Sequence, residues 1–296
     1  MPQTTSSISE LLVPGLSKIF FDAFKEREAE WPKFLNRRTS KRNFEEDLEM
    51  AGFGTMPTKD EGNPIQFQNI LQGTKRRYTH VSYGLGFRVT EEAMDDDLYG
   101  PIQRAPRLLA RSARDIREQV SANVLNLGFT TEVGFKSEAL FTATHTLLRG
   151  GTSSNRASTD ADLGVAALEA AIITIDEQKT EEGFPTLFVP RMLICGPQLM
   201  MIAEELLGSP MRPDTANNAI NPLARRGISW MVSHYLTDAD SWFVISDEHD
   251  LNMFLRKEIS FQAGDDFDTG DAKFKSTQRF VAGHGDWRGT YGSLGA

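Results

Sequence analysis

The chain lacks most of the chemistry that redox and metal-binding proteins use. Its 296 residues include one cysteine, Cys195, so an intramolecular disulfide and a cysteine cluster for zinc or iron–sulfur are excluded. We expect Cys195 to be a small buried hydrophobic residue. No apolar run approaches the roughly 20 residues that span a bilayer, and residues 1–10 lack the features of a secretion signal. We therefore expect a protein that folds in a cytoplasm without entering a membrane.

Motifs for catalysis are also missing. The sequence contains no nucleophile elbow, no phosphate-binding lysine loop and no dinucleotide-binding glycine motif. The acidic run Asp95–Asp97 could hold a hard cation, but the acidic first turn of a helix explains it without one. The five histidines have no metal-ligand spacing: His80, His145, His234, His249 and His284. We expect no cofactor, no metal and no enzymatic activity. A metal-dependent enzyme that uses the aspartates with a histidine is the weaker alternative.

A net charge of -9 argues against broad, nonspecific binding of nucleic acid, so any DNA contact must be local. A helix is predicted after Pro101 and Pro106, which interrupt the preceding region, with an apolar stripe from Leu109 to Leu127. The opposite face carries arginines at spacings of three and four: Arg104, Arg107, Arg111 and Arg114. This face is either solvated, which we favour, or turned toward DNA. Pairs of Arg111 with Asp115 and of Arg114 with Glu118 are also predicted.

The clearest strand pattern runs from Arg77 to Val89, where apolar and polar residues alternate. Thirteen extended residues span roughly 40 Å, so this strand must project or run along a thin body. We predict that it pairs with Ile65–Leu71 across a turn at Gln72–Thr74. Such a two-stranded ribbon is marginal in water and needs a second surface. Its basic tip would suit an acidic surface, and the residues expected at this interface are Lys75, Arg76, Arg77 and Tyr78.

The remaining patterns predict an α+β chain. Residues 1–60 contain one amphipathic helix, Leu16–Ala29, and a charged stretch, Asn36–Glu49, which we interpret as an arm that lies on another surface. Thr90 with Glu91 and Glu92 predicts a helix start. Trp242 and Trp287 are anchors either of a core or of an interface. Two further helices are predicted, one at Asp160–Glu182 and a short one that opens at Gly196 and Pro197 and ends at Leu207. Further strands are predicted at Leu187–Cys195, Ile228–Tyr235, Trp242–Ser246, Leu255–Phe261 and Lys273–Ala282.

From about Leu11 to the C-terminus, the order and spacing of several stretches resemble those of tailed-phage major head proteins, in particular the Mu-like head subunit family. The stretches are Tyr83–Ala93 (YGLGFRVTEEA), Asp95–Tyr99 (DDDLY), Leu140–His145 with Gly150 and Gly151, Val232–Trp242 (VSHYLTDADSW) and Gly285–Gly292 (GDWRGTYG). None of them is catalytic. Each stretch alone is weak, and the set carries the resemblance.

The resemblance implies the tailed-phage major capsid protein fold. By this reading, residues 1–60 are the N-terminal arm and 61–89 the extended loop, a β-ribbon. Residues 90–182 and 263–296 form a peripheral domain with a spine helix, and 183–262 form an axial domain. Because the arm starts almost at once, separate scaffolding and protease proteins are expected.

The function implied is that of a structural subunit of an icosahedral virion capsid, assembled in the bacterial host cytoplasm. Its partners would be its own copies in pentamers and hexamers, a scaffolding protein, a maturation protease and a portal. The shell would enclose double-stranded DNA without sequence-specific binding. An encapsulin-type shell subunit, which encloses proteins, shares the fold and stays open as an alternative.

Overall fold

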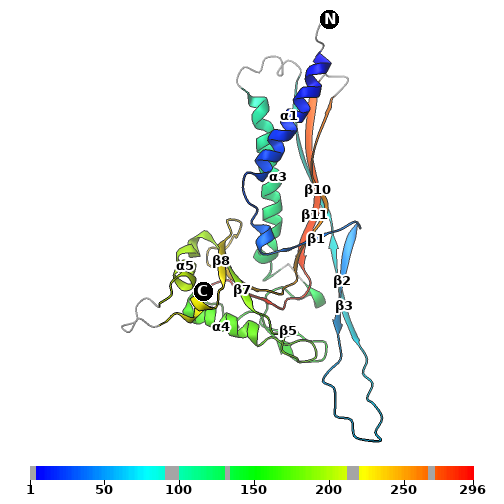
Figure 1. The fold of residues 1–296 in the computed structure, drawn as a ribbon, viewed down its shortest axis with the longest axis vertical. Coiled ribbons are helices and arrows are strands. Elements are labelled where there is room, and N and C mark those ends of the chain that lie inside the picture. The colour runs from blue at the N-terminus through cyan, green and yellow to red at the C-terminus, as the bar shows by residue number, and fades with distance from the viewer. Residues whose placement is uncertain (1–4, 91–99, 131–133, 212–219, 266–270) are drawn as a thin grey trace.

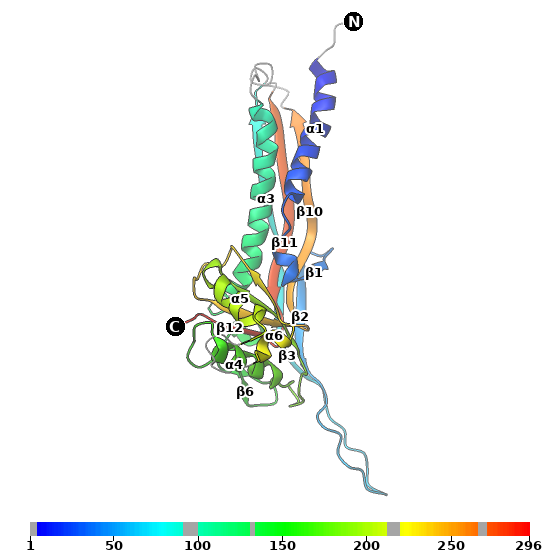
Figure 2. The same ribbon diagram turned by 60° about the vertical axis from the view of Figure 1, so that its left-hand side comes forward.

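A computed structural model describes residues 5–90, 100–130, 134–211, 220–265 and 271–296. These residues form a long sheet with two helices along one face, a compact part beside its lower end, and a ribbon that projects beyond both (Figure 1). The view turned by 60° shows the same thin, elongated body (Figure 2).

The elements alternate along the chain. The helices are α1 (Thr5–Lys25), α3 (Pro101–Asn126), α4 (Val165–Asp176), α5 (Met200–Gly208) and α6 (Pro222–Arg225), with 3-10 turns at Trp31–Lys33, Phe135–Ser137 and Pro197–Leu199. The strands are β1 (Asn36–Thr39), β2 (Phe44–Ala51), β3 (Leu71–Thr79), β4 (Val81–Val89), β5 (His145–Thr146), β6 (Thr152–Ser153), β7 (Pro190–Cys195), β8 (Ser229–Val232), β9 (Trp242–Ser246), β10 (Leu251–Asp265), β11 (Ala272–His284) and β12 (Thr290–Ser293).

The long sheet has the order β1-β10-β11-β4. Strand β11 is antiparallel to both of its neighbours, β10 and β4, whereas β1 runs parallel to β10. Buried and exposed residues alternate along most of β11, as expected where one sheet face is covered. Helices α1 and α3 provide that cover, and Phe20 of α1 stacks on Phe261 of β10 with ring centroids 5.0 Å apart. The interpretation of residues 1–60 as an arm on another surface is therefore wrong for α1, which lies on its own chain.

Helix α3 holds the N-terminal segment to the long sheet. Pro101 occupies the first turn, where its missing N–H costs nothing. Pro106 lies inside the helix, so the prediction that it interrupts this region is wrong. Buried Arg117 lies between the rings of Phe24 and Phe280 and donates to Gln278 Oε1 on β11 at 2.8 Å.

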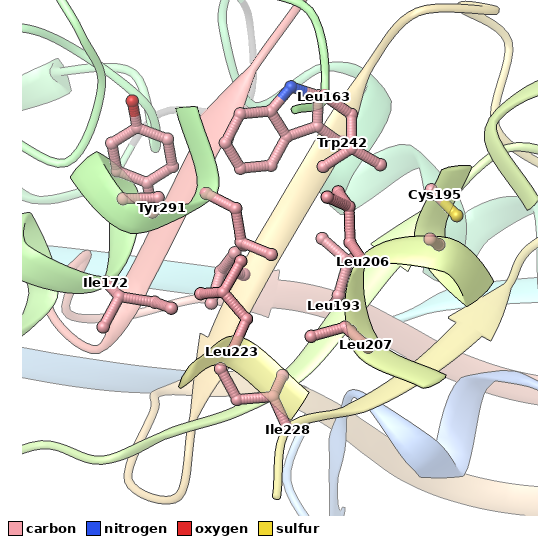
Figure 3. Close-up of a cluster of buried hydrophobic side chains, with 14 of the residues drawn as sticks. Leu163, Ile172, Leu193, Cys195, Leu206, Leu207, Leu223, Ile228, Trp242 and Tyr291 are labelled. Carbon is pink, nitrogen blue, oxygen red and sulfur yellow. The ribbon is translucent and has the colours of Figure 1, made fainter. Parts of the chain in front are cut away.

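The compact part is built on a second sheet of order β12-β9-β7-β8, with α4, α5 and α6 packed against it. Its core gathers apolar side chains from these helices and strands (Figure 3). Trp242 is fully buried there and donates from Nε1 to the carbonyl oxygen of Ala161 at 3.0 Å, so it anchors a core. Cys195 is buried beside it, as predicted, and burial raises the pKa of its thiol to about 11.

The ribbon is formed by different strands from those predicted. Strand β3 pairs with β2, from Phe44 opposite Thr79 to Ala51 opposite Leu71, whereas β4 pairs with β11 of the long sheet. His80 separates β3 from β4, and the predicted turn at Gln72–Thr74 lies inside β3. The prediction that Ile65–Leu71 pairs with Arg77–Val89 in one chain is wrong. The acidic residues of β2 face basic residues of β3, and this stabilises the strand pair.

Most other predicted elements are present with different bounds. The helix of Asp160–Glu182 is the shorter α4, and the strand of Leu187–Cys195 begins at Pro190. Strand β9 matches the prediction, while β10 and β11 extend beyond it. Strands β1, β2 and β12 were not predicted. The helix start at Glu91 and Glu92 and the acidic run Asp95–Asp97 lie outside the described residues.

Candidate assembly surfaces

Several side-chain contacts hold the two strands at the base of the ribbon together. Arg77 donates to Glu46 Oε1 from Nε and from a terminal nitrogen, at 2.9 and 2.7 Å, and its guanidinium lies 4.1 Å from the ring centroid of Phe44. Glu49 forms an ion pair of 3.0 Å with Lys136, which follows α3 in the chain. These contacts fix the direction in which the ribbon leaves the body.

Tyr78 and its neighbours form the buried end of the ribbon. The Tyr78 ring is 2% exposed, contacts Phe254 at a centroid distance of 4.9 Å and lies 5.0 Å from the Arg76 guanidinium. Burial raises the pKa of the Tyr78 hydroxyl far above its usual value, so it stays protonated. A Cβ at Gly283 would lie 3.0 Å from Cε1 of this ring, so glycine lets β11 pass close to Tyr78.

The connecting loop, residues 52–70, extends beyond the paired strands. Within it, the Gly54 amide donates to Gln68 Oε1 at 2.9 Å, and the Asn63 amide donates to the Asp60 carbonyl at 3.2 Å. Large apolar side chains are nevertheless exposed here: Phe53, Met56, Ile65, Phe67 and Ile70. Exposed apolar surface of this kind is typical of sites that bind another macromolecule.

The residues predicted for the ribbon tip lie elsewhere. Lys75, Arg76, Arg77 and Tyr78 are in β3, opposite Leu48 and the preceding residues of β2, so they belong to the base of the ribbon. Tyr78 packs inside its own chain. A basic tip is therefore wrong, and intersubunit contacts by the three cations stay a prediction. The sequence signal that could have placed them is the acidic pair Glu46 and Asp47, which lie opposite Arg77 and Arg76 in the antiparallel register.

The arginine face of α3 is only partly free. Arg104 and Arg107 are exposed. Arg111 forms a 3.8 Å ion pair with Glu26 of the segment after α1, and Arg114 pairs with Asp115 at 3.7 Å. The predicted pairs of Arg111 with Asp115 and of Arg114 with Glu118 are wrong. Glu118 instead accepts from the backbone amides of Glu30 and Trp31.

A polar cavity of about 350 Å³ lies between the ribbon base and the loop after β11. Three of its carboxylates are paired with cations: Glu49 with Lys136 at 3.0 Å, and Glu181 and Asp286 with Arg288 at 2.7 and 3.0 Å. Paired charges of this kind hold segments together. No cluster of three or more metal-ligating side chains occurs in the part of the chain that the structure describes, and none of its helices could cross a membrane.

Comparison with known proteins identifies the architecture. The profile of the family described as "Phage capsid protein" matches residues 73–293. No curated protein matches the chain. Among solved structures, the mature capsid of bacteriophage PhiM1 aligns with a TM-score of 0.61 at 10% identity, over 90% of this chain and 86% of that chain.

Two further solved structures come from protein shells. The virus-like particle of Pyrococcus furiosus aligns with a TM-score of 0.53 at 10% identity, over 94% of this chain and 97% of that chain. The SrpI encapsulin of Synechococcus elongatus aligns with a TM-score of 0.53 at 9% identity, over 89% and 86%. At these identities the likeness establishes the fold. Because the profile covers well over half of the sequence, the chain belongs to the phage capsid protein family.

Proposed function

We propose that this protein is the structural subunit of an icosahedral phage head, which assembles into pentamers and hexamers and encloses double-stranded DNA. The observation that carries the proposal is the connecting loop, residues 52–70, which exposes apolar side chains at the end of a projecting ribbon. Isolated ribbons of this kind are not stable by themselves in water. A neighbouring copy supplies the missing surface.

The proposal also assigns parts of the chain to the shell. In this proposal the arm is residues 1–43 rather than 1–60, and the extended loop is 44–79 rather than 61–89, because β2 supplies one side of the ribbon and β4 pairs within the long sheet. The peripheral domain, predicted as 90–182 with 263–296, is the long sheet with the spine helix α3, and the axial domain, predicted as 183–262, is the compact part. Helix α4 then belongs to the axial domain and β10 to the peripheral domain. A projecting ribbon that meets a different patch on its neighbour gives a heterologous contact, which closes into rings.

The partners follow from this role. The shell is assembled in the bacterial cytoplasm with a scaffolding protein, a maturation protease and a portal, and the subunit belongs to the Mu-like head subunit group. The exposed guanidinium groups of Arg104 and Arg107, with Arg111 and Arg114 beside them, would face the packaged DNA without reading its sequence.

A second candidate is a subunit of an encapsulin-type shell, favoured by the similarity to the SrpI encapsulin over most of both chains. The two functions differ in what the particle encloses. Purified particles that contain enzymes and no DNA would support this candidate, whereas particles that a packaging motor fills with DNA support the phage head.

Deletion of residues 53–70, with an Asn-Gly turn joining Gly52 to Leu71, tests the function. The deletion leaves β2, β3 and β4 intact, so we expect a folded monomer that forms no shells by electron microscopy. The control is the full-length chain, assembled in parallel under the same conditions. Shells of normal size from the deleted protein would contradict the proposal.

A further inference from the structure

We propose that residues 65–70 of one copy add as an extra strand to the free edge of β4 in a neighbouring copy. This inference rests on the proposed shell function and names the surface that the connecting loop meets. It is carried by an open sheet edge, an apolar groove beside that edge, and a strand-forming segment whose pairing partner is missing in its own chain.

The open edge is the outer side of β4. In the long sheet β4 pairs with β11 along all nine of its residues, and within the described residues no strand pairs with its other side. The strand has no proline and a single charged residue, Arg88. Natural edge strands are normally protected by charges, proline or bulges. An unprotected edge of this length is a site for strand addition.

An apolar groove runs beside this edge. Leu85 of β4 lies on the face of the sheet that α3 covers, in register with buried Ser276 of β11, yet its side chain is 57% exposed. With Leu109, Ala113 and Ile116 of α3 it lines a hollow of about 250 Å³. When a strand adds to a sheet edge, alternate side chains enter such a groove and give the contact its specificity.

The segment that fits is Ile65–Ile70. Its residues alternate, with Ile65 and Phe67 on one face and Gln66 and Gln68 on the other, a pattern typical of a strand. Phe67 is 93% exposed, and residues 65–70 form no strand in the single chain. Neither this segment nor Val81–Phe87 carries a charge, so backbone hydrogen bonds and apolar contacts would hold them together.

The geometry rules out the same pairing within one chain. The nine residues of β3 separate Ile70 from His80 and the start of β4, a distance of about 30 Å for an extended strand. Both views show the connecting loop pointing away from α3 and the long sheet (Figures 1 and 2). The edge of β4 and residues 65–70 can therefore meet only between copies.

Disulfide cross-linking tests the inference in assembled particles of the full chain. Gln66→Cys is combined with Ser82→Cys or Gly84→Cys, two positions on β4 that cover neighbouring registers. A Cβ at Gly84 makes only ordinary contact, 3.4 Å from Thr277 Cγ2. Strand pairing brings the Cα atoms within the roughly 5.5 Å that a disulfide needs, so at least one pair should give a ladder of covalent multimers on non-reducing gels. Buried Cys195 can stay in place.

The control combines Gln66→Cys with Ala170→Cys on the exposed side of α4. Shells in which both β4 pairs cross-link no more than this control overturn the inference. In a second measurement, Leu85→Asp is compared with Ile173→Asp, since Ile173 on α4 is 53% exposed and similar in kind. We expect Leu85→Asp to abolish shells without changing the melting temperature of the monomer, and shells at the normal yield would contradict the inference. If the proposed function itself fails, the unsubstituted chain forms no rings or shells.

Discussion

His145 is buried against the indole of Trp287, with ring centroids 4.0 Å apart and planes 3° from parallel. Its Nε2 lies 3.0 Å from Asn155 Oδ1 and its Nδ1 lies 3.3 Å from Glu138. Burial lowers the pKa of His145 below its usual 6.5, although Glu138, Asn155 and Asp286 favour the protonated ring. Because the folded pKa lies below the unfolded one, this group's contribution to stability is complete above pH 6.5 and is lost as the pH falls through the folded pKa.

The His145→Gln variant should therefore lose less stability on acidification. We expect the free energy of unfolding of the unsubstituted protein to fall more steeply between pH 7 and pH 5 than that of the variant, as measured by chemical denaturation at each pH. His234→Gln is the matched control, because the His234 side chain is 70% exposed. Equal slopes for His145→Gln and the unsubstituted protein would show that His145 does not titrate in this way.

Glu118 provides a second test at this scale. Its carboxylate oxygens accept from the Glu30 and Trp31 amides, each at 3.0 Å, in a buried position. Glu118→Ala leaves two amides without an acceptor, so we expect a loss of about 3 kcal/mol in the free energy of unfolding at neutral pH. Gln119→Ala, on an exposed position of the same helix, should change it little. If Glu118→Ala lowers the free energy of unfolding no more than the control does, water accepts from the two amides in place of the carboxylate.

Burial was predicted correctly for residues whose own side-chain chemistry favours it. Cys195 follows from the lack of any cysteine partner, and one of the two readings of Trp242, a core anchor, is correct. Glu118 was expected to pair with Arg114, but its buried position favours backbone amides from the N-terminal segment, which are 87 and 88 residues away. Contacts over such separations leave no local pattern in a sequence.

At the scale of elements, the periodicity of the sequence predicts where the strands of the ribbon lie but not which strands pair. Alternation located the strands near Arg77–Val89, but it could not reveal that His80 divides them between two sheets. Strand β2 was missed because its acidic residues resemble a solvated segment. Their partners are the cations of β3, and cross-strand charge pairs become visible only once the pairing is known. Strands with apolar runs, such as β9, were predicted with correct bounds.

The connecting loop gives a prediction at this scale. Phe53→Ser combined with Phe67→Ser removes apolar surface that a single chain leaves exposed, so the melting temperature of the monomer should not fall. We expect the yield of shells to drop strongly, as measured by sedimentation and electron microscopy. The matched control is Phe141→Ser, a buried substitution that should unfold the monomer. A double variant that forms shells at the normal yield would remove the loop from the interface.

At the scale of the whole molecule, the compact sheet links the two cores. Leu193 and Trp242 point into the core shown in Figure 3, and Val244 belongs to the same core. Ile194 and Phe243, which alternate with them, belong to the core under α3 and β10. The same two strands therefore serve both parts of the molecule, which should unfold together.

Phe243→Ala tests this coupling. Truncating a buried phenylalanine costs about 3–5 kcal/mol, so we expect a single unfolding transition at a lower temperature. The transition is followed in parallel by calorimetry and by the near-ultraviolet circular dichroism of the aromatic side chains. Leu187→Ala, at an exposed position of the compact part, should leave the transition in place. Two separate transitions in the variant would show that the parts are independent.

The family and fold class could be predicted because the resemblance rests on segments spread over the chain rather than on one site. The missing information concerned long-range pairing. The order β1-β10-β11-β4 joins segments from both ends of the sequence, and no local pattern specifies such neighbours.

The passage from β3 into β4 through one residue, His80, has a mechanical consequence. Both His80 and Tyr78 are buried, so the backbone cannot bend freely where the ribbon meets the long sheet. The ribbon and β4 then behave as one stiff unit that is held at Tyr78. A force on the outer end of that unit is carried directly into the sheet beneath α3, so a shell built from such subunits would transmit tension from copy to copy through its backbones.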